Sequence, residues 1–333
     1  MKRVGYLYEN IYNLDNIMKE FNEICKNTKN KRKVNKFKEL KCINITKVYT
    51  MLKNRNYEVG PYIVFQITDP KPRTIVSQRM TDKLVNHLVS RHILQVALEN
   101  SFIETNVASR ENKGTKAGLE YYMKYRRNCK IKYGNYYILK CDIKKYFASI
   151  DHDILKEKLK KRIKDKDALD IVFKIIDSSE HGLGIGNMTS QVLAVFYLSD
   201  LDHYIKEVLK IKYYVRYQDD FVLFHESKEY LKECLEKIKV FLEKEKLTLN
   251  DKTRIYNSNG NIIFLGRDKY GRYAKYRRVK RKIKKSLHLY NTNKIMLSGI
   301  MNTIRNYENL LGRKIKVKNT YKDGKKEVCK ILR

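Results

Sequence analysis

The sequence has no tryptophan, only three prolines and no Cys-x-x-Cys pair among its six cysteines. Without paired spacings, neither a zinc site nor a disulfide framework is indicated, so we expect reduced thiols. No apolar run approaches 18 residues, and the opening Met1-Lys2-Arg3-Val4-Gly5 leads into no signal-peptide core. These absences predict a soluble, cytoplasmic protein with no membrane-spanning segment.

Acidic residues are scarce relative to basic ones. The 37 Asp and Glu residues face 72 Lys and Arg residues, which gives a formal net charge of +35 spread along all 333 residues. A field of this sign attracts polyanions, and nucleic acid is the first candidate. The most basic run, Lys26–Lys33, is interpreted in two ways: as a solvated loop, or as a contact to phosphate or to an acidic partner.

Periodicity divides the chain into a helical start, a mixed middle and a basic tail. Residues 1–60 carry apolar side chains at helical spacing, and the three prolines bracket a hairpin between residues 61 and 76. The tail from Arg267 is expected to be mostly helical. Because no repeat and no flexible linker is visible, we expect one continuous body. The predicted strands are 62–67, 74–76, 139–143, the two arms of 213–224, and 262–266.

The most informative motif is Tyr217-Gln218-Asp219-Asp220, which lies between two apolar and aromatic runs. This pattern predicts a β-hairpin with two adjacent carboxylates at a tight turn. Upstream, Asp142 ends another predicted strand. Taken singly, each aspartate is more simply a turn former or a helix cap. Three carboxylates from two neighbouring strands are instead typical of a two-metal site for nucleotidyl transfer.

Phosphodiester formation requires an ionised primer 3′-hydroxyl and a neutralised triphosphate. Two Mg²⁺ ions held by carboxylates and by the triphosphate itself do both. The sequence therefore predicts Asp142 and Asp219 as metal ligands, with Asp220 as the third ligand or as a supporting residue.

From about residue 61 to residue 266 the chain resembles the reverse transcriptases. Asp142-Ile143-Lys144-Lys145-Tyr146-Phe147 is similar to the first palm motif of that family, and Tyr217-Gln218-Asp219-Asp220 to its Tyr-x-Asp-Asp motif. Phe264-Leu265-Gly266 resembles the primer-grip strand. The resemblance implies an α/β (α+β) right-hand polymerase. Its expected parts are a basic helical extension (1–60), fingers (61–135), a palm (136–268) and a short helical thumb (269–333).

The resemblance also implies roles for individual residues. Phe147 would lie under the incoming sugar and exclude a 2′-hydroxyl, unless it is only a core aromatic. Lys71 and Arg73 would bind the triphosphate, unless they form a solvated basic turn. Lys252 would protonate the leaving pyrophosphate, although a surface lysine is the simpler interpretation. The remaining implied residues are Ile143 at the metals, Ile185, Gly186 and Gln191 at the substrate, and Phe264, Leu265 and Gly266 in the primer grip.

The segment Gly184–Gln191 indicates a subgroup. Ile185 stands where the family generally has Gln, and this variant resembles the reverse transcriptases of diversity-generating retroelements. Losing the amide would relax the check on base geometry, although Ile185 could equally be a packing residue. Leu183-Gly184 departs from the Leu-Pro usual in that group, and defence-associated reverse transcriptases share parts of the motif.

Three biological roles therefore stay open: relaxed-fidelity retroelement synthesis, antiphage cDNA synthesis from a dedicated non-coding RNA, and a polymerase-fold RNA-binding scaffold. The implied partners are a template RNA, an RNA/DNA duplex, dNTPs and a small accessory protein, with no membrane.

Overall fold

The computed structural model describes residues 3–67, 73–260, 262–272, 276–311, 315, 317–322 and 325–331. The chain forms two compact units, Met1–Gly260 and Asn261–Arg333. The expectation of one continuous body is wrong, because the tail closes a core among its own helices. The boundary carries no proline-rich or glycine-rich linker that the sequence could have revealed.

The first unit opens with three helices, as the periodicity of residues 1–60 predicts: α1 (Leu14–Asn27), α2 (Lys31–Glu39) and α3 (Lys41–Lys53). Asparagine side chains cap the N-termini of two of these helices. Asn13 accepts hydrogen bonds from the backbone at the start of α1, and Asn30 does the same for α2. Helix α1 packs against α4 (Met80–Val89), which joins the N-terminal helices to the rest of the unit.

Two antiparallel strands, β1 (Ile63–Ile67) and β2 (Arg73–Ser77), form the predicted hairpin. Pro61 precedes β1, and its fixed φ angle is compatible with an extended chain at this point. Lys71 lies outside the described residues. Arg73 begins β2, but its side chain is likewise outside the described part of the structure.

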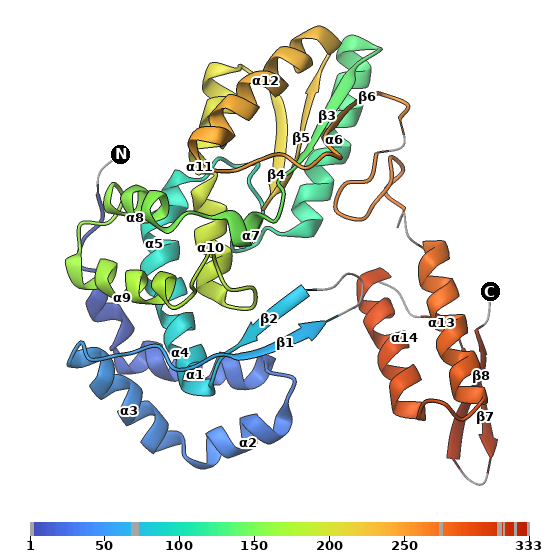
Figure 1. The fold of residues 1–333 in the computed structure, drawn as a ribbon. Helices are drawn as coiled ribbons and strands as arrows, with labels where there is room; N and C mark the ends of the chain where they lie inside the picture. Colours follow the sequence, from blue (N-terminus) through green and yellow to red (C-terminus); the bar gives the residue numbers. More distant parts are fainter. Residues whose placement is uncertain are drawn as a thin grey trace. The chain divides into compact units, whose positions relative to one another are not determined.

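A four-stranded antiparallel sheet forms the centre of the first unit, in the order β4-β5-β3-β6. Helix α12 (Lys228–Lys244) packs against β3, β5 and β6, and α6 (Thr115–Tyr133) packs against β4 and β5 (Figure 1). The predicted strand at 139–143 and the predicted hairpin at 213–224 are confirmed. The strands are β3 (Tyr137–Asp142), β4 (Tyr213–Tyr217), β5 (Asp220–His225) and β6 (Arg254–Asn257).

Helix α10 (Met188–Tyr197) is nearly all buried and contacts both α4 and η2, a π-helical turn at Ser90–Leu94. Its burial follows from its composition, since it carries no charged residue. The other helical segments of the first unit are η1 (Tyr8–Ile11), α5 (Gln95–Leu98), η3 (Glu99–Ser101), α7 (Tyr146–Ser149), α8 (His152–Lys160), α9 (Lys166–Asp177), α11 (Ser199–His203) and η4 (Tyr204–Val208).

The second unit contains α13 (Tyr276–Asn291), α14 (Leu297–Leu311) and a hairpin of β7 (Val317–Lys322) and β8 (Lys325–Ile331). The predicted helical tail is confirmed for the two helices, but the hairpin was not predicted. The predicted strand at 262–266 is wrong. Phe264 and Arg267 form an isolated bridge around Leu265 and Gly266, whose φ angles of 48° and 77° reverse the chain.

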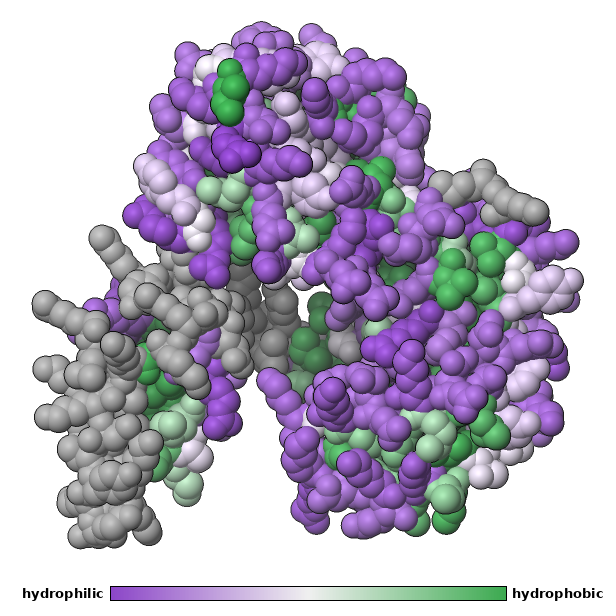
Figure 2. Space-filling view, turned by 180° about the vertical axis from the view of Figure 1, so that it is seen from behind, coloured by the Kyte–Doolittle hydropathy of each residue, from purple (hydrophilic) through white to green (hydrophobic). Residues whose placement is uncertain are grey.

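In the face shown in Figure 2 the surface is mostly hydrophilic, with small separate apolar patches. Within the described residues, no helix combines the length and the apolar character needed to cross a bilayer.

Candidate active site

The β4–β5 hairpin and the end of β3 bring the three predicted aspartates together. Asp142 is directly opposite Asp220 in the β3–β5 register, and Tyr217 is opposite Asp220 in the β4–β5 register. Gln218 and Asp219 therefore form the two-residue turn. The sheet thus places the end of the first motif beside the tip of the second, although 77 residues separate Asp142 from Asp219 in the sequence.

Lys140 supplies a positive charge to this edge of the sheet, and the sequence analysis missed it. Side chains two residues apart share one face of a strand, so Lys140 projects from β3 on the same face as Asp142. Its Nζ donates a hydrogen bond to Asp220 Oδ1 at 2.5 Å. The sequence did offer a sign of this contact, because Lys140 and Asp142 are two residues apart in a predicted strand.

The surroundings of Asp220 change the pKa of its carboxyl group. Burial is the largest cause that raises the pKa of Asp220, and the nearby Asp142 and Asp219 carboxylates add to it. Lys140 opposes the increase, and the resulting pKa is about 6. The Asp220 side chain keeps 25% of its surface exposed, so solvent and substrate can reach it. Carboxylates arranged in this way favour the binding of a cation.

Within the described residues, no three His, Cys, Asp or Glu side chains converge closely enough to enclose a metal ion by themselves. The donor chemistry still fits a hard divalent cation. Asp142 and Asp220 face each other, and Mg²⁺ is usually held by one or two carboxylates plus substrate phosphates. The pKa of Asp220 is raised by burial and by the Asp142 and Asp219 carboxylates, and a bound cation would offset both effects.

The turn residue Gln218 has a φ angle of 55°, which is uncommon outside glycine. Its side-chain amide donates to Ser109 Oγ at 3.0 Å and to the Gln191 carbonyl at 3.4 Å. Its own carbonyl accepts a hydrogen bond from Arg216 Nη1 at 2.9 Å. These bonds from three separate segments hold the turn, and hence Asp219, in a conformation that would otherwise be strained.

A buried ion pair supports the same hairpin. The Arg216 guanidinium donates to both carboxylate oxygens of Asp202, at 2.7 Å from Nε and 2.6 Å from Nη2. Both side chains are fully buried. Tyr214 and Asn106 donate further hydrogen bonds to the same carboxylate, at 2.6 and 3.0 Å. The sequence analysis missed this group, although an arginine inside an apolar strand was a usable signal.

The predicted substrate loop lies against the β1–β2 hairpin. The Val76 backbone N–H of β2 donates to the Ile185 carbonyl at 3.0 Å. Gly186 has a φ angle of 129°, and a Cβ there would lie 2.4 Å from the Val76 carbonyl oxygen. Only glycine permits this approach. The Ile185 side chain remains 37% exposed, so it is not a fully buried core residue.

Phe147 follows the first motif and lies next to the same loop. Its backbone carbonyl accepts a hydrogen bond from the Leu183 N–H at 2.7 Å, and its ring makes an edge contact with Tyr146. The ring is half-buried and packs partly against the core. This arrangement is compatible with either interpretation of Phe147, because the ring contacts the core and also retains an exposed surface.

Among the other predicted residues, Ile143 directly follows Asp142, and Lys252 lies in a loop that is hydrogen-bonded to Asp142. The Asn250 N–H donates to the Asp142 carbonyl at 2.7 Å, which ties down the loop that carries the exposed Lys252. Ile143 is buried and bridges to Leu249. Phe264, Leu265 and Gly266 belong to the second unit, where the Phe264 side chain is buried.

Comparisons with solved structures give a telomerase from Candida albicans, determined with a TWJ fragment of telomeric RNA, at a TM-score of 0.51 and 13% identity over 78% of this chain. An apo telomerase from Candida tropicalis, truncated from its C-terminal domain, gives a TM-score of 0.49 and 16% identity over 68%. The chain spans only 57% and 58% of these two proteins. No curated protein matches the sequence.

The likeness to the first of these structures supports a right-hand polymerase fold. The family profile described as reverse transcriptase (RNA-dependent DNA polymerase) matches residues 68–268, which is more than half of the chain and includes all three aspartates. Enzymes of this family use divalent metal ions. The chain therefore belongs to the reverse transcriptase family.

Proposed function

We propose that this protein is an RNA-directed DNA polymerase that makes cDNA from a template RNA by two-metal nucleotidyl transfer. One observation carries the proposal: Asp142 and Asp220 face each other across β3 and β5, with Asp219 in the adjoining turn. The match of residues 68–268 to the reverse transcriptase family supports it.

In this proposal Asp142 and Asp219 hold two Mg²⁺ ions, with Asp220 and the backbone of Ile143 completing the site. Bound Mg²⁺ would favour ionisation of the primer 3′-hydroxyl and neutralise the triphosphate. Lys140 balances the charge of Asp220, and the hydrogen bonds of Gln218 fix the direction of Asp219. The turn is thereby organised before substrate arrives, which is how electrostatic preorganisation lowers a barrier.

Selection of the nucleotide is assigned to the residues around the loop at 182–187. Phe147 would exclude the 2′-hydroxyl of a ribonucleotide, while Gly186 and Gln191 line the space beside the nascent base pair. Lys71 and Arg73 would bind the triphosphate, and Lys252 would protonate the departing pyrophosphate. Phe264, Leu265 and Gly266 would grip the primer.

For the biological setting we propose a bacterial diversity-generating retroelement that copies its template RNA with relaxed fidelity in the cytoplasm, together with a small accessory protein. The exposed apolar side chain of Ile185 supports this choice, because it offers no amide to a mispaired base. The alternative is an antiphage enzyme that copies a dedicated non-coding RNA. Gly184 stands where the retroelement enzymes usually have proline, and this departure weakens the first choice. A Cβ at this position would lie 2.8 Å from a Val76 methyl group, so the local packing suits glycine better than proline.

Deep sequencing of co-purified nucleic acid tests both levels of the proposal. The wild type should carry cDNA that the Asp219→Ala variant lacks, while both retain RNA. Substitutions clustered at template adenines would support the diversification setting, and Ile185→Gln should then reduce them. Faithful or repetitive cDNA from one non-coding RNA would support the antiphage setting. RNA without cDNA in either sample would favour the polymerase-fold scaffold.

A further inference from the structure

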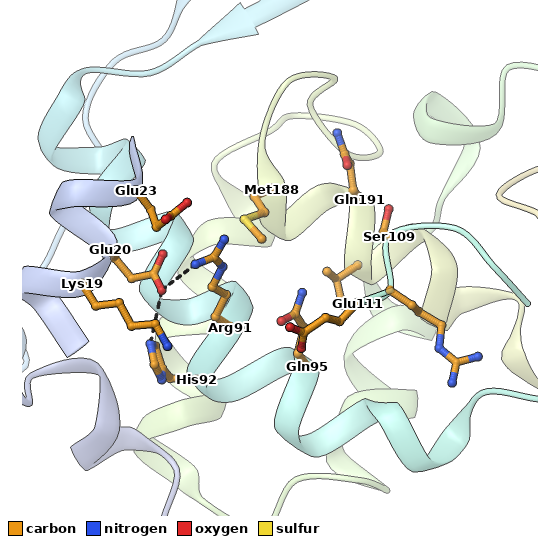
Figure 3. A pocket seen from close by; sticks show the side chains of 12 residues that line it. Lys19, Glu20, Glu23, Arg91, His92, Gln95, Ser109, Glu111, Met188 and Gln191 are labelled. Atoms are coloured by element: carbon orange, nitrogen blue, oxygen red, sulfur yellow. Dashed lines mark hydrogen bonds and ion pairs between the residues drawn. The ribbon is translucent and has the colours of Figure 1, made fainter. Parts of the chain in front are cut away.

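A polar cavity of about 620 Å³ lies in the first unit, beside the hairpin that carries the aspartates. Its walls come from α1, from η2 and α5, from the loop at 109–111, and from the start of α10 (Figure 3). We refer to it as the α1–α10 cavity. Of the residues given a role above, Ser109 and Gln191 form part of its wall.

One wall of the α1–α10 cavity is built around a buried carboxylate. Glu20 of α1 is fully buried and accepts a hydrogen bond from Arg91 Nη1 at 3.0 Å. Nitrogen atoms of His87 and His92 lie 3.5 and 3.7 Å from its oxygens. Burial opposes ionisation of Glu20, but the nearby His87 and His92 rings and the Arg91 guanidinium outweigh it and hold its pKa below the usual range. Arg91 is thereby fixed in the wall, with 31% of its side chain exposed.

The opposite wall is tied to the turn between the aspartates. Ser109 and Gln191 both line the cavity, and both accept hydrogen bonds from the side-chain amide of Gln218. A molecule bound there would touch the residues that hold the turn. The cavity is therefore placed to hold a part of the substrate rather than an unrelated ligand.

A second cavity, of about 340 Å³, shares Met188 and Gln191 with the first and is lined by Ile75, Val76 and Gly186. The start of α10 thus separates a space beside β2 from the α1–α10 cavity. If the templating base occupies the space beside β2, the neighbouring nucleotide of the same strand can reach the α1–α10 cavity around Met188 and Gln191.

We propose that the α1–α10 cavity binds one unpaired ribonucleotide of the template strand, next to the templating position on its single-stranded side. This inference rests on the proposed function. Lys19 and Arg91 suit the single phosphate of such a unit, and Met188 and Val192 offer an apolar surface to the base. A triphosphate is excluded because its charge would face several carboxylates.

The acidic and amide side chains of the cavity are the reason to expect an RNA strand rather than a DNA strand. Glu23, Gln95 and Glu111 line the cavity and can accept a hydrogen bond from a 2′-hydroxyl, which DNA lacks. Carboxylates near a strand of either kind repel its phosphates equally. A hydrogen bond from the 2′-hydroxyl offsets this repulsion for RNA and not for DNA.

Photocrosslinking locates the bound nucleotide directly. The probe is a DNA primer annealed to an RNA template with a six-nucleotide single-stranded 5′ overhang, in which each overhang position in turn is 4-thiouridine. The expected result is a strong crosslink from one position, or from two adjacent positions, to peptides containing His92 or Met188. Crosslinks from the overhang to other surfaces only would overturn the proposal.

Equilibrium binding tests the preference for RNA. An RNA overhang should bind about tenfold more tightly than a DNA overhang on the same duplex. Gln95→Leu should remove most of this difference, and Lys19→Glu should weaken both overhangs. The matched control is Lys47→Glu, because Lys47 is an exposed lysine of α3 that does not line the cavity. Equal binding of RNA and DNA overhangs by the wild type would contradict the proposal.

The two proposals fail separately in these experiments. Crosslinks to His92 or Met188 in a protein that cannot extend the primer would support the cavity proposal and count against polymerase activity. Primer extension with crosslinks confined to other surfaces would overturn the cavity proposal and leave the polymerase proposal intact.

Discussion

Arg216 and Asp202 form a bidentate ion pair in which neither side chain is exposed to solvent. Arg216 also donates to the Gln218 carbonyl in the turn that separates Tyr217 from Asp220, and to the Val195 carbonyl of α10. One guanidinium therefore connects the β4–β5 hairpin to α10. The position of Asp219 depends on a charge that is satisfied entirely within the protein.

Removing one partner of this pair should be strongly destabilising. Asp202→Ala leaves the Arg216 charge buried and unpaired, so we expect the free energy of unfolding to fall by about 3–5 kcal/mol. The double variant Asp202→Leu/Arg216→Met should lose less, because no charge then remains buried. Urea denaturation monitored by circular dichroism measures both. Equal losses in the single and double variants would contradict this explanation.

Asp220→Asn should stabilise the protein at neutral pH in the absence of divalent ions. The pKa of Asp220 is about 6 in the fold and near 3.8 without it, so its ionised form disfavours folding above pH 6. We expect a gain of about 1–3 kcal/mol at pH 7.5, reduced by the loss of the Lys140 contact. The gain should shrink as the pH falls from 6 and vanish below about 4, where Asp220 is neutral in both states.

Thermal unfolding in EDTA across this pH range provides the test. Asp170→Asn is the matched control, since Asp170 is an exposed carboxylate of α9. A gain that persisted at pH 4, or that appeared equally in the control, would show that the charge of Asp220 is not its cause.

The requirement for Mg²⁺ should depend on pH through the same carboxylate. Below pH 6 a proton competes with the cation for Asp220, so the Mg²⁺ concentration for half-maximal primer extension should rise about tenfold per pH unit. Above pH 6.5 it should be nearly constant. The measurement is a Mg²⁺ titration of the initial rate between pH 5 and 8. A flat response below pH 6 would remove Asp220 from the metal site.

The sequence predicted the parts of the site that depend on local pattern. The two apolar and aromatic runs on either side of a polar turn within residues 213–224 predict a hairpin, and β4 and β5 confirm it. The arrangement of Asp142 opposite Asp220 depends on the order in which β3 and β5 pair, which no local signal specifies. Lys140 and Asp202 were missed because their partners are 80 and 14 residues away.

The error at residues 262–266 has a different origin. Ile262, Ile263 and Phe264 have high strand propensity, but Leu265 and Gly266 adopt positive φ angles and close a turn. Strand propensity alone could not show that the chain reverses direction at the end of this apolar run. The β7–β8 hairpin was missed because polar and charged residues outnumber apolar ones in both strands, so no apolar alternation predicts them.

Phe147→Val should relax the choice of sugar. If the ring excludes a 2′-hydroxyl, the smaller side chain should raise the kcat/KM ratio for ribonucleotides over deoxynucleotides by roughly two orders of magnitude. Single-nucleotide extension with dATP and ATP measures the ratio. Phe173→Val is the control, because Phe173 is a partly buried ring of α9. An unchanged ratio would make Phe147 a packing residue only.

The most direct test of the account is primer extension on an RNA template with purified wild type, Asp142→Asn and Asp219→Ala, alongside the exposed-residue control Asp170→Ala. We predict Mg²⁺-dependent DNA synthesis by the wild type and the control. The other two variants should lose at least about a thousandfold in rate while binding the primer–template with unchanged affinity. Synthesis that survives Asp142→Asn or Asp219→Ala would contradict the assignment of these carboxylates as the metal ligands.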